Sequence, residues 1–128
     1  MPTVTAKALR AALGRVPIVD ARAAERFRGD IEPLDSVAGH IPGALNRPFK
    51  SNLDESGRFK PAETLAREFR DLLGWQAAEE VVHQCGSGVT ACHNLLAMEA
   101  AGLPGTILYP GSWSEWSADP TRPVARGG

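Results

Sequence analysis

The residues best suited to chemistry lie in one short segment, Cys-Gly-Ser-Gly-Val-Thr-Ala, which begins at Cys85. A thiol between a strand and a helix lies near unpaired backbone N–H groups and the positive end of the helix dipole, and both favour the thiolate. Gly86 and Gly88 can adopt conformations closed to other residues, so that successive N–H groups point at one anion. The segment therefore predicts a nucleophilic cysteine whose loop can hold a sulfur atom or an oxyanion.

Other polar groups near this cysteine have competing explanations. Ser87 could pass a proton to a leaving group as a general acid. Alternatively, the hydroxyls of Ser87 and Thr90 could serve only to shape the loop. Cys85 itself could be a small buried hydrophobe in a tight turn, but its spacing and context favour a functional role. We expect the second cysteine, Cys92, to pack in the core or to be a bystander, with a redox role as the weaker alternative.

The elements around the loop are expected to alternate between strands and helices. A buried strand over 80–84 leads into the loop, and a helix over 90–101 follows it. The pattern Ser-x-x-Glu at 112–115 predicts a capping box before a short helix. Further strands are expected at 17–20, 44–46 and 106–109, and further helices at 5–13, 23–27 and 61–73.

This alternation predicts an α/β fold with a mostly parallel sheet and helices on both faces. Ligands of such folds bind beyond the carboxyl ends of the strands, where Cys85 is placed. A length of 128 residues suits a single domain over 1–128 that buries its own core.

Composition narrows the range of partners. The formal net charge of −1 and the 23% charged residues give no sign of a nucleic-acid ligand. No apolar run could span a bilayer and the first residues do not form a signal peptide, so we expect a cytoplasmic protein that does not bind membranes. The two cysteines lack the pairing of a zinc site and are expected to be thiols, and no metal or organic cofactor is expected.

Several segments together resemble one protein family. The loop from Cys85, followed by Ala-Cys-His, is similar to the active-site loop of the 3-mercaptopyruvate branch of the rhodanese family. The segments Val-Asp-Ala-Arg at 19–22, Arg-Phe-Arg-Gly at 26–29, Gly-His-Ile-Pro-Gly-Ala at 39–44 and Gly-Ser-Trp-Ser-Glu-Trp at 111–116 agree with it. The similarity covers nearly the whole chain and is strongest to the C-terminal, catalytic half of tandem two-domain sulfurtransferases.

This resemblance implies a rhodanese-like fold and a sulfurtransferase. Cys85 would take a sulfur atom from 3-mercaptopyruvate or thiosulfate as a persulfide and pass it to cyanide or to a thiol such as thioredoxin. The chain would be either a single-domain relative or a fragment whose N-terminal rhodanese domain walls the active site. In the family that other domain completes a Ser-His-Asp relay, so Ser87 in this chain would lack those partners.

The resemblance also assigns roles to individual residues. The loop residues Gly86, Gly88, Val89 and Thr90 would bind the donor, and Arg26 would hold its carboxylate. Asp20 and Arg22 would brace the loop, with an ordinary surface ion pair as the alternative. Many family members have Glu-Pro-Arg where this chain has Glu-Pro-Leu at 32–34, which puts a second carboxylate clamp in doubt.

The residues after the cysteine bear on the choice of donor. Thiosulfate-preferring members have Arg and Lys at the positions of Gly86 and Ser87, and such cations suit a dianion. Their absence favours 3-mercaptopyruvate. A cysteine phosphatase would need an arginine at the position of Ala91, so that alternative is poor, whereas a non-catalytic module that carries sulfur from a partner protein stays open.

Overall fold

A central parallel sheet organises the protein. The computed structural model describes residues 2–74, 76–86 and 89–127. Among them, the strands are β1 (Ile18–Asp20), β2 (Leu45–Asn46), β3 (Val82–Gln84) and β4 (Ile107–Leu108). They form one sheet in the order β2-β1-β3-β4, and each neighbouring pair is parallel. The sequence prediction of a parallel sheet is confirmed.

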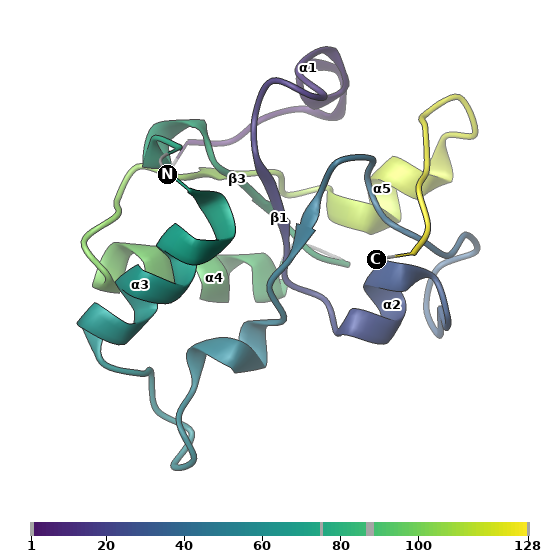
Figure 1. Ribbon diagram of the computed structural model, residues 1–128. Helices are drawn as coiled ribbons and strands as arrows, with labels where there is room; N and C mark the ends of the chain where they lie inside the picture. Colours follow the sequence, from purple (N-terminus) through teal and green to yellow (C-terminus); the bar gives the residue numbers. More distant parts are fainter. Residues whose placement is uncertain (1, 75, 87–88, 128) are drawn as a thin grey trace.

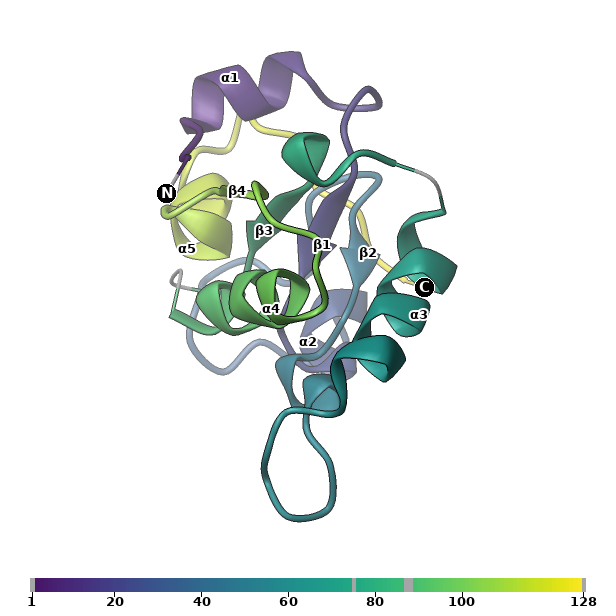
Figure 2. The same cartoon turned by 90° about the vertical axis from the view of Figure 1, so that its left-hand side faces the viewer.

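Helices cover both faces of this sheet. Figures 1 and 2 show α3 (Ala62–Leu73) and α4 (Val89–Ala100) on one face. The helices α1 (Ala6–Ala11), α2 (Ala24–Arg28) and α5 (Ser112–Ala118) contribute side chains to the core on the other face. Because both faces are covered, every residue of β1 and β3 is buried, as expected for strands inside a parallel α/β sheet.

Each face has its own apolar core. Trp113 and Trp116 of α5 are fully buried and pack with side chains from α1, α2 and the sheet. On the opposite face, Leu65 and Phe69 of α3 pack with Met98 of α4. Burial of such large side chains stabilises each by roughly 1.5–3 kcal/mol relative to exposure, which fixes α4 and α5 beside the end of β3.

The long segment between α2 and α3 contains little regular structure. It includes β2, a 3-10 helix (η1, Phe49–Asn52) and a bridge between Leu53 and Phe59 that closes a protruding loop (Figure 2). A second 3-10 helix, η2 (Ala78–Glu80), precedes β3. The short strand expected at 44–46 is therefore confirmed as β2.

The C-terminal residues hold this long segment in place by hydrogen bonds. The backbone of Ala125 exchanges two hydrogen bonds with that of His40, at 2.8 and 2.9 Å, and the Arg126 guanidinium donates to the Gly29 carbonyl at 2.8 Å. Gly39 has a φ of 125°, and a Cβ on it would lie 2.4 Å from the Ala125 carbonyl oxygen. Only glycine fits this crossing.

Candidate active site

Cys85 lies directly after β3 at the carboxyl end of the strand. Its side chain is buried, with 1% of the residue exposed, and packs in a cluster with Ala21, Ala91, Leu95 and Leu108. The helix α4 begins four residues later. The structure thus places the thiol between a strand end and a helix N-terminus, as the sequence predicted.

The start of the cysteine loop is held by α5. The backbone N–H groups of Trp113 and Ser114 donate to the carbonyl oxygens of Cys85 and Gly86, each at 2.8 Å. These N–H groups belong to the first turn of α5 and have no partner within that helix. The two loop carbonyls are therefore fixed against α5. Ser87 and Gly88, predicted to act in catalysis and donor binding, lie outside the described residues.

Ser112 is a site residue that the sequence did not reveal. Its Oγ accepts a hydrogen bond from the backbone N–H of Cys85 at 3.0 Å and donates to the carbonyl oxygen of Tyr109 at 2.9 Å. The same Oγ lies 4.0 Å from Cys85 Sγ. Ser112 is fully buried. Among the described residues, its hydroxyl therefore lies beside the thiol.

The expected capping box at Ser112 and Glu115 is wrong. Gly111 occupies the N-cap position and no side chain caps the helix. Instead, Glu115 accepts a hydrogen bond from the Tyr109 hydroxyl at 2.7 Å, and Ser112 turns towards the cysteine. Burial and this bond raise the pKa of Tyr109. The pattern failed because tertiary partners outcompete the local ones.

Arg26, from α2, lies against the cysteine loop. A Cβ on Gly86 would lie 3.3 Å from one terminal nitrogen of its guanidinium. That nitrogen also lies 3.1 Å from Glu32 and 3.6 Å from Asp35. The side chain is 18% exposed, so Arg26 is not a freely solvated surface charge. The guanidinium faces both the loop and two carboxylates.

Glu32 joins the two arginines of this region. Its carboxylate accepts from the backbone N–H groups of Leu34 and Asp35 at 3.0 Å, and it pairs with Arg22 at 3.5 Å as well as with Arg26. Burial alone would raise the pKa of Glu32, but the two N–H donors and Arg26 outweigh it and hold the pKa below its usual value. Glu32 is therefore ionised at neutral pH.

Asp20 and Arg22 form a buried ion pair at the end of β1. The Asp20 carboxylate accepts from the backbone N–H of Arg22 at 2.9 Å and from its guanidinium at 2.8 Å, and both side chains are at most 1% exposed. Arg22 also donates to the Gly39 carbonyl at 2.7 Å. The alternative of a surface ion pair is thus wrong. The Arg22 guanidinium thus reaches Glu32 and Gly39, in the segment that surrounds Arg26.

The remaining loop residues open α4. Val89 is its first residue and is 75% exposed, whereas Thr90 is partly buried. Among the residues that the structure describes, neither makes a contact that bears on the predicted donor binding.

The three histidines have structural surroundings. His40 stacks on Phe27 and bonds to its carbonyl oxygen through Nδ1 at 2.7 Å. His93 lies edge-on to two phenylalanine rings. His83, in β3, is fully buried with Nε2 at 3.2 Å from Met98 Sδ, and burial lowers its pKa to about 4. Within the described ranges, no group of three or more His, Cys, Asp or Glu side chains could hold a metal ion.

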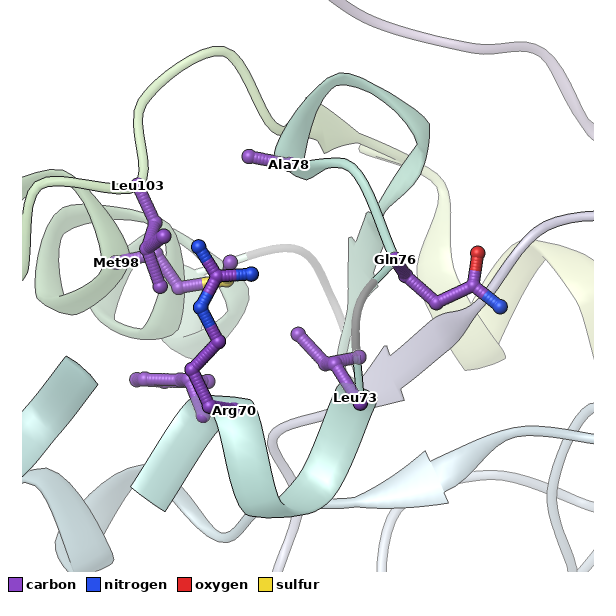
Figure 3. Close-up of a pocket in the computed structure, with 8 residues that line it drawn as sticks. Arg70, Leu73, Gln76, Ala78, Met98 and Leu103 are labelled. Atoms are coloured by element: carbon purple, nitrogen blue, oxygen red, sulfur yellow. The ribbon is translucent and has the colours of Figure 1, made fainter. Parts of the chain in front are cut away.

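One small cavity lies away from the cysteine. Figure 3 shows Arg70 and Leu73 of α3 facing Met98 of α4 across it. Its volume is about 10 Å³, which is room for about one water molecule. Its wall includes residues that precede β3, so it lies towards the amino end of that strand. It is too small for a sulfur donor. No helix in the described part of the chain is long and apolar enough to cross a membrane.

The fold is that of a small α/β domain with a cysteine loop at the carboxyl end of a central strand. The Rhodanese-like domain family matches residues 5–119 of the sequence, and the chain belongs to that family. The resemblance noted from the sequence is thereby confirmed.

Similar proteins carry sulfurtransferase names. The chain is 54% identical over 126 residues to a Pseudomonas aeruginosa protein named "Probable 3-mercaptopyruvate sulfurtransferase", covering 97% of this chain and 44% of that protein. It is 42% identical over 99 residues to chicken thiosulfate sulfurtransferase, covering 77% and 34%. The solved 3-mercaptopyruvate sulfurtransferase from Leishmania major matches with a TM-score of 0.73 and 32% identity, covering 91% and 32%. The chain thus spans less than half the length of these relatives.

Proposed function

We propose that this domain is a sulfurtransferase that carries sulfur as a persulfide on Cys85. The observation that carries the proposal is the thiol itself, buried after β3 beside the N-terminus of α4, with an arginine against its loop. The sulfurtransferase names of its relatives support the same reaction class.

The reaction is a double displacement. The Cys85 thiolate attacks the donor sulfur, an S–S bond forms, and the C–S bond of mercaptopyruvate breaks. Its electron pair leaves as the enolate, which takes up a proton to give pyruvate. An acceptor thiolate, or cyanide, then attacks the outer sulfur and releases the Cys85 thiolate. We propose a thiol protein such as thioredoxin as one acceptor.

We propose 3-mercaptopyruvate as the preferred donor. Gly86 and Ser87 supply no side-chain cation, whereas a dianion such as thiosulfate needs strong positive charge. Arg26 would hold the single carboxylate of mercaptopyruvate, in competition with Glu32 and Asp35. The backbone of Gly86, Gly88, Val89 and Thr90 would surround the sulfur, and Ser87 would protonate the enolate.

A second domain would complete the site. The apolar side chains of Leu34 and Val89 are 78% and 75% exposed, one beside the Arg26 partners and the other beside the cysteine loop. We propose that an N-terminal rhodanese domain covers them, because the relatives are more than twice as long as the matched region. Turnover by the isolated domain would then be slow, while formation of the persulfide would persist.

The test is mass spectrometry of the chain after incubation with 3-mercaptopyruvate or with thiosulfate. We expect one added sulfur on Cys85, formed faster from mercaptopyruvate, and none in C85S. The matched control is C92S, which removes the other cysteine and should keep the added sulfur. No added sulfur from either donor would contradict the proposal. Loading only by a partner desulfurase would instead indicate a sulfur carrier.

A further inference from the structure

Ser112 has a backbone conformation that is costly for serine. Its φ is 53°, and it is the one non-glycine residue with a positive φ in the described part of the chain. Residues with a side chain rarely adopt this region, and such strain persists only where the surroundings impose it. Here the strained residue is also the one whose hydroxyl touches the cysteine backbone.

The surroundings of Ser112 fix this conformation from both sides. Before it, the Tyr109 hydroxyl bonds to Glu115, and a Cβ on Gly111 would lie 2.2 Å from the Glu115 carboxylate. After it, the Trp113 N–H donates to the Cys85 carbonyl. The turn that carries Ser112 is thus closed against the cysteine loop at each end.

The hydroxyl of Ser112 has one proton and two acceptors within reach. In this structure the Tyr109 carbonyl is the nearer acceptor, at 2.9 Å, and Cys85 Sγ lies at 4.0 Å. A charged sulfur is a stronger acceptor than a thiol, because hydrogen bonds to ionised groups are shorter and roughly twice as strong. Rotation about one side-chain bond would move the proton from the carbonyl towards the sulfur.

We propose that Ser112 is a positioning residue for Cys85, with two roles. Its oxygen holds the backbone N–H of the cysteine, and its proton turns from Tyr109 to the sulfur when that sulfur becomes negative. No covalent bond changes in this step. The proposal rests on the proposed function only in taking Cys85 as the nucleophile.

The experiment measures how the rate of Cys85 alkylation by iodoacetamide depends on pH, with fragment-ion mass spectrometry to separate Cys85 from Cys92. The variants are S112A, which keeps a side chain in the strained conformation, and S112G, which relieves the strain. Both remove the hydroxyl. The matched control is S117A, which removes another buried hydroxyl of α5, one that bonds to the Trp113 carbonyl instead of the cysteine.

We expect the midpoint of the pH profile to rise by about one pH unit in S112A and S112G, the size of one hydrogen bond to a charged sulfur. S117A should match the unmodified chain. A profile that shifts in S112A but returns to normal in S112G would show that Ser112 only shapes the turn, and would overturn the proposal. Unchanged profiles in both variants would overturn it as well.

Alkylation needs no sulfur donor, so the two proposals fail separately. A shifted profile in a chain that never gains sulfur would leave Ser112 as a positioning residue and refute the sulfurtransferase function. Normal persulfide formation with unshifted pH profiles would support the sulfurtransferase function and refute the role of Ser112. If S112A unfolds, S112G decides the question, because glycine adopts a positive φ at no steric cost.

Discussion

Breaking the ion pair between Asp20 and Arg22 should cost this domain a large part of its stability. In D20N, the amide keeps the shape of the carboxylate but loses its charge, and one of its atoms becomes a donor facing the guanidinium. The Arg22 guanidinium then stays buried with only Glu32, at 3.5 Å, as a charged partner. Removing one member of a buried pair typically costs 3–5 kcal/mol, and we expect about 3 kcal/mol because Glu32 remains.

The chain contains a matched control for this change. Arg28 and Asp30 form an ion pair with the same sequence separation and a similar distance, 2.9 Å against 2.8 Å, but their side chains are 42% and 59% exposed. Exposed pairs contribute roughly 0–1 kcal/mol, so D30N should change stability little. The comparison isolates burial from charge and spacing.

The assay is urea unfolding at pH 7, with the free energy of unfolding extrapolated to water for the parent chain, D20N and D30N. We expect the parent chain and D30N to have nearly equal free energies of unfolding, and D20N to have a much lower one. If D20N and D30N lose equal amounts, or if D20N loses less than about 1 kcal/mol, the pair is not stabilising in the way its burial implies.

Three further changes test other parts of the structure. His83 has a folded pKa of about 4, below the unfolded value of 6.5, so the unfolded chain binds more protons between these two pH values. The free energy of unfolding should therefore fall by about 3 kcal/mol as the pH drops through this window. Urea unfolding should show a shallower fall with pH in H83L, and an equal dependence on pH in both chains would contradict this. G39A should lower the free energy of unfolding by more than about 2 kcal/mol, because its Cβ would strike the Ala125 carbonyl at a φ of 125°. G86A should unfold at nearly the same urea concentration as the parent chain, but its KM for mercaptopyruvate should be higher, because the new Cβ would press on the flexible end of the Arg26 side chain. An unchanged KM would argue against Arg26 as the carboxylate anchor.

Much of the fold follows from local patterns in the sequence. The apolar runs that end in Asp20 and Gln84 become adjacent buried strands, and these two residues lie opposite each other in the sheet. Thr5 caps α1, with its hydroxyl accepting from the Ala8 N–H at 3.2 Å. Such features could be predicted because strand burial and helix capping depend on neighbouring residues.

The charges around Arg26 could not be predicted in the same way. The sequence suggested a carboxylate clamp, but not that Glu32 and Asp35 already surround the guanidinium. Their approach depends on the path of the segment between α2 and β2, where Ser114 bonds to Asp35 and Trp113 bonds to the Val37 carbonyl, both at 2.8 Å. These are contacts between residues more than 70 positions apart, which no local pattern encodes.

The helix α5 explains why the site depends on residues so distant in sequence. Its first turn bonds to the carbonyls of Cys85 and Gly86, and its side chains hold the segment that supplies the partners of Arg26. One short helix therefore holds both the start of the cysteine loop and the charges around Arg26, the proposed carboxylate anchor. Because these contacts share a rigid element, a change at the start of α5 should alter the thiol and the donor site together, whereas the exposed pair at Arg28 should affect neither.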